Sequence, residues 1–283
     1  AVPGFRHVPY NDLEAMRNAI SPATVAIMIE AIQGEGGITS ATPEYLLGLR
    51  KLCDEKKLLL LMDAVQCGHF RTGRFQSFQR ILENQVGQAS RLPSDDEQSS
   101  SSSNPEQAGE TPAPPFLPDG ISMAKSLGGG FPIGAFWVRE PHCDLLTAGS
   151  HGTTYGGSPI ACAVALRILQ VIQREKLADN ARNTGEFLKN GLLKLSEKFP
   201  TVIKTARGFG FMIGLELNEK IPAFTASDKS PAIQFVNRLH EAGMLAIPSG
   251  TQVIRLLPPL NLRRDEAEQG IKIIETVVQK LVQ

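Results

Sequence analysis

The stretch LLLLMDAV, residues 58–65, decides the fold, because an unbroken apolar run ends there in an acid. A second apolar run, TVAIMIEAI, occupies residues 24–32, and residues 43–57 between the two place leucines at helical spacing. Unbroken apolar runs are typical of strands that are buried on both faces, and a helix between two of them favours a right-handed crossover connection. The pattern therefore predicts an α/β fold, with a mostly parallel sheet flanked by helices.

Two more strands of the same sheet are predicted from GISMAK, residues 120–125, and GAFWV, residues 134–138. Beyond them, residues 160–176 carry apolar side chains on one helical face and lead into a series of shorter helices and strands. We therefore expect a larger first domain, residues 1–170, followed by a smaller C-terminal α+β domain, residues 171–283.

The composition changes abruptly between residues 85 and 115, where large apolar side chains become rare and serine, proline, glutamine and acidic residues dominate. Segments of this kind bury too little apolar surface to fold, so we expect a disordered low-complexity segment here. Similar strand-like sequence lies on both sides of it, which favours an insertion in a surface loop over a linker between domains. Such a loop is tolerable because each doubling of its length costs only about 0.6 kcal/mol in closure entropy.

The composition favours a small molecule as the partner of this protein. Its 283 residues include 29 Lys and Arg and 29 Asp and Glu, so no net field attracts nucleic acid or an anionic membrane. No apolar run approaches the ~20 residues that a membrane helix needs. The cysteines are widely spaced and form no CxxC pair, which argues against a disulfide framework and a metal site and favours a reducing cytoplasm.

Asp63 and Lys125 are the candidate chemical groups, because each follows a predicted strand of the same sheet. Ligands of open parallel sheets bind at the carboxyl ends of the strands, where both side chains are expected. A buried lysine loses its preference for charge, and its neutral amine can attack an aldehyde. An acid beside a pyridine nitrogen keeps that nitrogen protonated, so the pair suits pyridoxal 5'-phosphate. The alternative for Asp63 is a capping role in the turn after its strand.

The loop HGTTYGGSP, residues 151–159, is a candidate phosphate site, since the Thr153 and Thr154 hydroxyls and the glycines precede a helix. Glycine and threonine are also common in ordinary turns, which is the alternative. For SMAKSLGGGFPIGA, residues 122–135, the alternative is a nucleotide-binding loop. That loop has its glycines before the lysine, in the order GxxxxGK[ST], whereas here they follow Lys125.

Five segments, in the same order, resemble the class III, fold-type-I pyridoxal-phosphate-dependent aminotransferases. They are IEAIQGEGG (29–37), MDAVQCGHFRTGRF (62–75), SMAKSLGGGFPIGA (122–135), HGTTYGGSPIACA (151–163) and VIRLLPPLN (253–261). The resemblance extends over the chain apart from the insertion. It implies the fold-type-I architecture, in which a large cofactor-binding domain is followed by a smaller C-terminal domain.

The resemblance also implies how the residues meet the cofactor. Lys125 would form the Schiff base with pyridoxal phosphate and then move a proton as general base and general acid. Asp63 would pair with the pyridine nitrogen. Val65 would pack on one face of the ring, and Gln66 would reach its phenolic oxygen.

Substrate and partner contacts follow from the same resemblance. Thr153 and Thr154 would bind the phosphate of the cofactor in the partner subunit, which implies a homodimer with a shared active site. Arg255 would hold a substrate carboxylate with its planar guanidinium. Glu35 would pair with Arg255 when the amine end of a donor occupies the site. Without the resemblance, Arg255 would be interpreted as a surface ion pair.

The implied reaction moves the terminal amino group of N-acetylornithine to 2-oxoglutarate, a step of arginine biosynthesis. Related class III enzymes that act on succinyldiaminopimelate, ornithine or 4-aminobutyrate share these segments and are the alternatives. From a different class of protein, the alternative is an inactive remnant that acts only as a binding or interaction protein.

The chain departs from the family pattern at four positions and at its start. Ala31, Ala64, Phe70 and Ser158 stand where the family has proline, glutamate, glycine and asparagine. The chain begins where the large domain of the family is already under way, so we expect an N-terminally truncated member. The phosphate loop of the same subunit, the aromatic residue that stacks on the ring and the arginine for a distant substrate carboxylate would then be missing.

Overall fold

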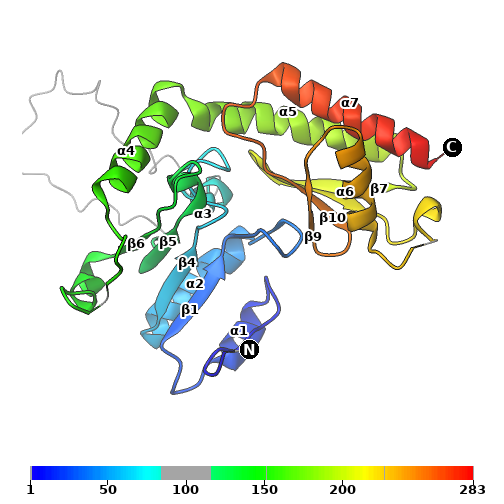
Figure 1. Cartoon of the computed structure of the whole chain (residues 1–283). Coiled ribbons are helices and arrows are strands. Elements are labelled where there is room, and N and C mark those ends of the chain that lie inside the picture. The colour runs from blue at the N-terminus through cyan, green and yellow to red at the C-terminus, as the bar shows by residue number, and fades with distance from the viewer. Residues whose placement is uncertain (1, 84–115, 151, 226, 283) are drawn as a thin grey trace, which may run out of the picture.

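The computed structural model describes residues 2–83, 116–150, 152–225 and 227–282, so the insertion expected at residues 85–115 lies outside the described residues. The helices are α1 (Leu13–Ala19), α2 (Pro43–Lys56), α3 (Ser77–Ile81), α4 (Pro159–Arg174), α5 (Leu177–Lys198), α6 (Pro231–Glu241) and α7 (Arg264–Leu281). The strands are β1 (Ala26–Glu30), β2 (Ile32–Gln33), β3 (Thr39–Ser40), β4 (Leu59–Asp63), β5 (Gly120–Met123), β6 (Ala135–Val138), β7 (Ile203–Phe209), β8 (Met212–Leu217), β9 (Ile247–Ser249) and β10 (Val253–Leu256). They form two main sheets, one in each half of the chain (Figure 1).

The first sheet has the strand order β1-β4-β5-β6, and its first three strands are parallel. Helix α2 lies in the connection from β1 to β4, as the apolar pattern predicts. Strand β6 belongs to the sheet, also as predicted, but pairs antiparallel with β5. The connection between these two strands, residues 124–134, is too short for the crossover that a parallel pair requires.

Helix α2 has clear signals at both ends. The Thr42 hydroxyl accepts a hydrogen bond from the Tyr45 N–H at 3.1 Å, and Pro43 occupies the first turn, where its missing N–H has no cost. Lys57 ends the helix in a left-handed conformation. The helix therefore stops directly before the apolar run that forms β4.

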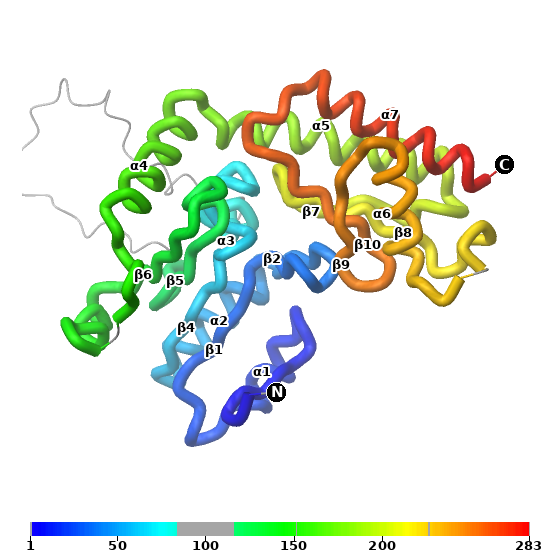
Figure 2. The backbone as a smooth tube through the Cα atoms, in the orientation of Figure 1, coloured from blue at the N-terminus to red at the C-terminus, as the bar shows by residue number. Residues whose placement is uncertain are grey.

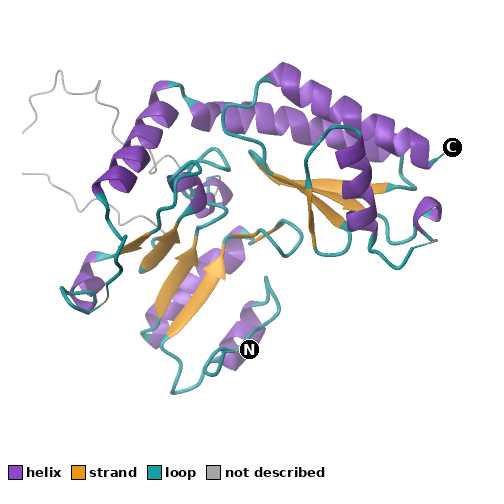
Figure 3. Cartoon of the chain, in the orientation of Figure 1, coloured by secondary structure: helices purple, strands orange, loops and turns teal. Residues whose placement is uncertain are grey.

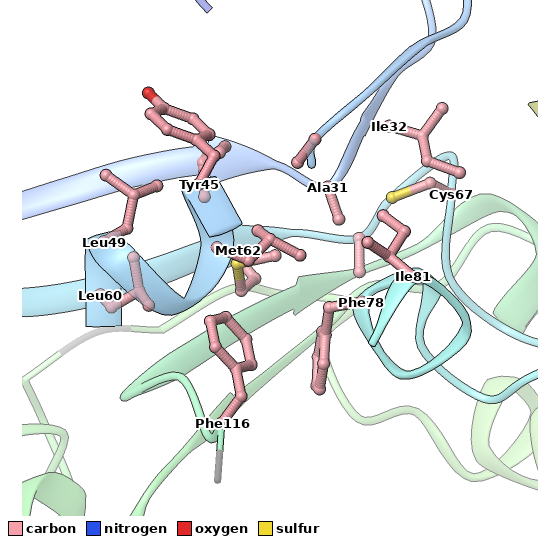
Figure 4. Packing of buried hydrophobic residues seen from close by; sticks show 14 of the residues in the cluster. Ala31, Ile32, Tyr45, Leu49, Leu60, Met62, Cys67, Phe78, Ile81 and Phe116 are labelled. Atoms are coloured by element: carbon pink, nitrogen blue, oxygen red, sulfur yellow. The ribbon is translucent and has the colours of Figure 1, made fainter. Parts of the chain in front are cut away.

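The core of the first half lies between α2 and the sheet. Figure 4 shows Leu49 of α2 and Leu60 and Met62 of β4 close to the rings of Phe78 and Phe116. These two rings are 5.1 Å apart between centroids. Burial of each such side chain contributes roughly 1.5–3 kcal/mol, so the cluster holds α2 and α3 against the sheet.

The opposite face of this sheet is less covered than the apolar runs predict. In strand β1, Ile27 and Ile29 are buried but Met28 is exposed. Figure 3 shows α2 behind β1 and β4, and no described helix lies over the face toward the viewer. Phe136 and Trp137 of the edge strand β6 are exposed as well. The prediction of strands buried on both faces is therefore wrong for β1 within the described chain, because its only crossover helix covers one face.

The second sheet is antiparallel, with the order β7-β8-β10-β9. Figure 2 shows α5 and α7 side by side along it, and α6 packs against β9 and β10. Leu192, Phe211, Ile213 and Phe235 are fully buried in this half. The expected α+β unit is confirmed, although its strand β7, IKTARGF, has no apolar run of the kind that predicted the strands of the first sheet.

Helix α4 links the two halves. Its buried side chains are Ala161, Ala165 and Ile172, whereas Leu166 on another side is 58% exposed. The proposed domain boundary after residue 170 falls inside this helix and stays a prediction. No helix in the described part of the chain combines the length and apolar character needed to cross a membrane.

Candidate active site

The carboxyl edge of the first sheet brings chemical groups from distant segments together. Glu30 at the end of β1 is in register with Asp63 at the end of β4, and Asp63 is in register with Ser122 of β5. Lys125 follows three residues after Ser122. Asp63 Oδ1 accepts a hydrogen bond from the Val65 N–H at 3.0 Å, which fixes the turn after the strand. Both the chemical role and the capping role considered for Asp63 are therefore compatible with its position.

Lys125 lines a cavity of about 580 Å³ at this edge. The cavity wall also includes Gln66, Arg71, Leu257 and Asn261, which come from both halves of the chain. Lys125 opens a short 3₁₀ turn and has a φ of 46°, an uncommon value for a residue with a side chain. Its side chain is exposed in the described chain, which differs from the buried lysine that we expected.

Arg255, Glu35 and Gln66 form a compact polar group beside the cavity. Nη1 of Arg255 donates to Glu35 Oε1 at 2.5 Å, to Gln66 Oε1 at 2.9 Å and to the Gly34 carbonyl at 2.9 Å. The Arg255 side chain is 6% exposed, whereas that of Glu35 is 76% exposed. The hydrogen bond from Arg255 holds the pKa of Glu35 below its usual value. Arg255 is thus a buried cation, whereas the carboxylate with which it pairs is exposed to solvent.

Glu30 is a further carboxyl group at this edge. Its Oε2 accepts a hydrogen bond from the Gly34 N–H at 3.2 Å. Burial raises the pKa of Glu30, and the negative charges of Asp63 and Glu35 add to that effect. The pKa of Glu30 is therefore raised, whereas that of Glu35 is lowered, so the two carboxyl groups differ in their tendency to ionise.

Thr153 and Thr154 are not part of this group in the single chain. Both are exposed in the segment before α4, and no hydrogen bond between described residues joins them to Lys125, Asp63 or Gln66. The neighbouring Ser158 caps α4 by accepting from the Ala161 N–H. Among the predicted site residues, the structure therefore brings together the sheet-edge and Arg255 groups and leaves the threonine loop apart.

Arg71 and Asn261 are among the residues of the cavity wall that were not predicted from the sequence. Arg71 is partly buried, and its Nη1 donates to the Pro258 carbonyl. It lies in the loop after Asp63, so its closeness to that aspartate could have indicated it. Asn261 lies in the quoted segment VIRLLPPLN, but nothing in its local sequence distinguishes it from a turn residue.

A mostly parallel sheet that presents a lysine and an aspartate at its carboxyl edge, joined to a second α+β unit, characterises the fold-type-I pyridoxal-phosphate-dependent transferases. Comparisons with known proteins narrow this class. The chain belongs to the family described as aminotransferase class-III, whose model matches residues 2–83 and 111–278.

Acetylornithine aminotransferases are among the most similar curated proteins. Those of Gloeobacter violaceus and Methanocaldococcus jannaschii are each 37% identical to this chain, over 280 and 279 residues. Each match covers 99% of this chain and 59% of the relative, so the chain spans less than two thirds of the length of these proteins.

Solved structures agree with this assignment of the family. Acetylornithine aminotransferase from Elizabethkingia anophelis matches with a TM-score of 0.78 at 30% identity, over 98% of this chain and 60% of that one. Ornithine aminotransferase from Toxoplasma gondii ME49 matches with a TM-score of 0.78 at 31% identity, over 99% of this chain and 57% of that one.

Class III aminotransferases depend on pyridoxal phosphate, and the residues at this edge fit that group. The cavity volume of about 580 Å³ is in the usual range for small-molecule sites. Its charged wall residues are Lys125, Arg71 and Arg167, and the described wall includes no acidic residue, which suits an anionic cofactor. In the cavity wall, the Lys125 amine and the Gln66 amide suit the aldehyde and the phenolic oxygen of the cofactor. Asp63 lies outside this wall, at the end of strand β4 beside β5, and is the carboxylate that could keep a pyridine nitrogen protonated.

Proposed function

We propose that the whole protein transfers the terminal amino group of N-acetylornithine to 2-oxoglutarate with pyridoxal phosphate as its cofactor. The observation that carries the proposal is the Arg255–Glu35 pair beside Gln66, next to the cavity that Lys125 lines. The names of the most similar curated relatives support N-acetylornithine as the donor.

Each of the proposed site residues would contact a different part of the cofactor. Bound pyridoxal phosphate supplies an aldehyde and a ring that accepts electrons. The Lys125 amine would hold the cofactor through its aldehyde and would move a proton at the substrate carbon. The Asp63 carboxylate would keep a proton on the ring nitrogen, and Val65, two residues further along in the same turn, would pack on the ring. The Gln66 amide would donate to the phenolic oxygen.

Glu35 and Arg255 allow one site to take two different substrates. Because the Glu35 side chain is largely exposed, it can turn away without leaving a buried cavity. The planar guanidinium of Arg255 is then open to a carboxylate of 2-oxoglutarate, which it can bind through two parallel hydrogen bonds. When the donor is bound, Glu35 returns and neutralises Arg255, whose buried charge would otherwise have no counter-charge.

We further propose that the protein is a homodimer. Thr153 and Thr154 are exposed and stand apart from Lys125, so a phosphate site for them in a partner subunit is consistent with their position. Exposed apolar side chains on α4, Ile160 and Leu166, supply a surface that a second copy can bury. We place the protein in the cytoplasm because its cysteines are unpaired among the described residues.

Covalent trapping tests the assignment of Lys125. The whole protein is incubated with pyridoxal phosphate, reduced with borohydride and digested, and the pyridoxyl group is expected on the Lys125 peptide alone. Lys125→Ala is expected to abolish the label, whereas Lys51→Ala, on the exposed side of α2, should leave it unchanged. A label that persists in Lys125→Ala would contradict the assignment.

Amino-donor turnover tests the substrate. We expect the rate with N-acetylornithine and 2-oxoglutarate to exceed that with ornithine, succinyldiaminopimelate or 4-aminobutyrate. Activity on 4-aminobutyrate but none on N-acetylornithine would overturn the proposed donor and leave the class of reaction in place.

A further inference from the structure

The turn that carries Glu35 is held by side chains from the other half of the molecule. This turn, Gly34–Gly37, lies between β2 and β3 in the first half of the chain. Besides Glu30 and Thr39 of the first half, its side-chain hydrogen-bond partners come from β7, β9 and β10 of the second half. The position of Glu35 therefore depends on how the two halves meet.

Ser249 at the end of β9 closes both ends of this turn with one hydroxyl group. Its Oγ donates to the Gly34 carbonyl at 2.8 Å and accepts from the Gly37 N–H at 2.8 Å. Ser249 is 1% exposed, so water does not compete for either hydrogen bond. The first and last residues of the turn therefore both bond to the same atom, Ser249 Oγ.

Arg207 of β7 fixes the other polar group of Gly37. Its Nε and Nη2 donate to the Gly37 carbonyl at 2.9 Å and 2.7 Å, and Glu216 of the neighbouring strand holds its Nη1. Gly37 has a φ of 79°, and a Cβ at this position would lie 3.2 Å from Arg207 Nη2. The positive φ therefore favours glycine here, and the approach of Arg207 leaves little room for a side chain.

The same turn also holds Arg255. The Gly34 carbonyl that accepts from Ser249 accepts from Arg255 Nη1 as well, at 2.9 Å. When Glu35 turns away, Arg255 keeps this carbonyl and the Gln66 oxygen as partners. The Gly34 carbonyl thus helps to hold Arg255 in place while a substrate carboxylate replaces Glu35.

We propose that Ser249 is a positioning residue that fixes the 34–37 turn, so that a substrate carboxylate can replace Glu35 on Arg255 while the backbone stays still. The consequence for substrates rests on the proposed function. Ser249 does not belong to the described wall of the cavity that Lys125 lines. It acts through the Gly34 carbonyl and the Gly37 N–H, and it therefore sets the affinity for the dicarboxylic acceptor.

Amide hydrogen exchange of the whole, cofactor-loaded protein tests the backbone part of the proposal. Ser249→Ala removes the hydroxyl partner of the Gly37 N–H, so exchange in residues 34–37 should become about five- to tenfold faster, as expected for the loss of one hydrogen bond. Exchange in β1 and α2 should not change, which shows that the fold is intact. Ser196→Ala is the matched control, because its hydroxyl bonds only to Leu193 of its own helix.

Binding of glutarate, a dicarboxylate that cannot accept an amino group, tests the consequence for Arg255. Ser249→Ala should weaken glutarate binding about five- to tenfold, whereas Ser196→Ala should not. The KM for 2-oxoglutarate should rise by a similar factor, with the KM for the amino donor within about twofold of its original value. A purely structural defect would instead change both KM values together.

The outcomes separate this inference from the proposed function. Unchanged exchange in residues 34–37 would overturn the role of Ser249, and so would faster exchange with unchanged glutarate affinity. Faster exchange together with weaker glutarate binding supports it. If the unaltered protein binds no glutarate, the proposed function fails together with the acceptor role of Ser249, while exchange still decides whether Ser249 fixes the turn.

Discussion

Gly34 shows how a single residue without a side chain shapes the site. A Cβ at this position would lie 1.8 Å from Gln66 Oε1, far too close for two non-bonded atoms. The absence of a side chain at Gly34 therefore lets Gln66 lie against the turn and accept from Arg255 at 2.9 Å. Glycine is required here by the close approach of Gln66 and not by backbone conformation.

Gly34→Ala should displace Gln66 and weaken the hold on Arg255. We expect glutarate to bind at least about tenfold more weakly, with a loss of stability of about 1–2 kcal/mol from the crowding. Gly270→Ala is the matched control, because a Cβ in the middle of α7 meets only Met244 at 4.0 Å. That change should stabilise the protein by roughly 0.5–1 kcal/mol through helix propensity. Equal glutarate affinity in Gly34→Ala and the unaltered protein would contradict this account.

His69 is a second residue with a specific consequence, in this case for pH. It is fully buried, neither ring nitrogen has a hydrogen-bond partner, and its φ is 52°. Burial lowers its pKa, so the folded protein resists protonation more than the unfolded chain does. Stability is therefore complete above the ordinary pKa near 6.5 and is lost as the pH falls from there toward the lowered folded value.

His69→Asn should flatten this dependence. Asparagine tolerates a positive φ but does not titrate, so the loss of stability below pH ~6.5, up to about 1.4 kcal/mol per pH unit, should disappear. Urea unfolding at a series of pH values measures the slope, and His7→Asn on the exposed amino-terminal segment should retain it. A slope that is the same in all three proteins would assign the effect to other groups.

At the scale of elements, one buried carboxyl group joins a helix and two strands. Asp119 Oδ2 accepts from the Leu60 N–H of β4 at 2.8 Å and from Arg50 Nη1 of α2 at 2.7 Å, and Oδ1 faces Arg139 after β6. Burial raises the pKa of Asp119, but the Leu60 and Arg50 hydrogen bonds outweigh it and leave the pKa below its usual value. The carboxylate therefore ties the crossover helix to the sheet at neutral pH.

Asp119→Asn should cost about 2–3 kcal/mol at neutral pH, because Arg50 loses its buried counter-charge. A carboxyl group with a lowered pKa stabilises the fold above its ordinary pKa near 3.8 and loses that contribution as the pH falls through the folded value. The difference between the two proteins should therefore shrink below pH ~4. Asp54→Asn, which removes the exposed partner of Arg50, should cost less than about 1 kcal/mol. Similar costs for both changes in urea unfolding would refute the role of Asp119.

At the scale of the whole molecule, two sheets of different construction meet at the polar group around Arg255. The parallel sheet supplies the lysine and the carboxylates, and the antiparallel sheet supplies the arginine that binds a carboxylate. Hydrogen bonds join the two halves: Gly37 and Ser249 are 212 positions apart in the sequence, and Gly34 and Arg255 are 221 positions apart. Exposed apolar side chains remain on α4 and β6.

Leu166→Glu on α4 should weaken self-association if this surface is the dimer interface. The side chain is 58% exposed in the single chain, so the fold itself should change by less than about 0.5 kcal/mol. Sedimentation equilibrium is expected to show a dimer for the unaltered protein and a shift toward the monomer for Leu166→Glu. Leu245→Glu, at an 89% exposed position of the second half, is the control and should remain dimeric. Dissociation by both changes, or by neither, would argue against α4 as the interface.

The predictable part of the fold was the part with strong local patterns. The apolar runs and the leucines at helical spacing between them located β1, α2 and β4, and the segment GISMAK located β5. The polar sequence IKTARGF hid strand β7, residues 203–209, because its stability comes from pairing with β8 rather than from its own composition. The antiparallel direction of β6 follows from the length of a connection and could have been inferred.

The candidate site likewise has residues that local sequence patterns predict and residues that they do not. Asp63 and Lys125 could be predicted because each ends a recognisable strand, and the carboxyl ends of parallel strands share one edge. Arg255 and Glu35 were indicated by family resemblance, but their 2.5 Å contact joins segments more than two hundred residues apart. Ser249 had no local signal, because its role lies in two hydrogen bonds to a distant turn.

The sequence by itself therefore determined the parallel α/β core, the lysine and the aspartate at its edge, and the family. Only the tertiary structure decided which charges meet, how exposed Lys125 and Glu35 are in the single chain, and which residues hold the 34–37 turn. Periodicity and capping act over a few neighbouring residues, so they can be recognised along the chain. Hydrogen bonds between the two halves depend on the packing of both sheets, which no local stretch of sequence encodes.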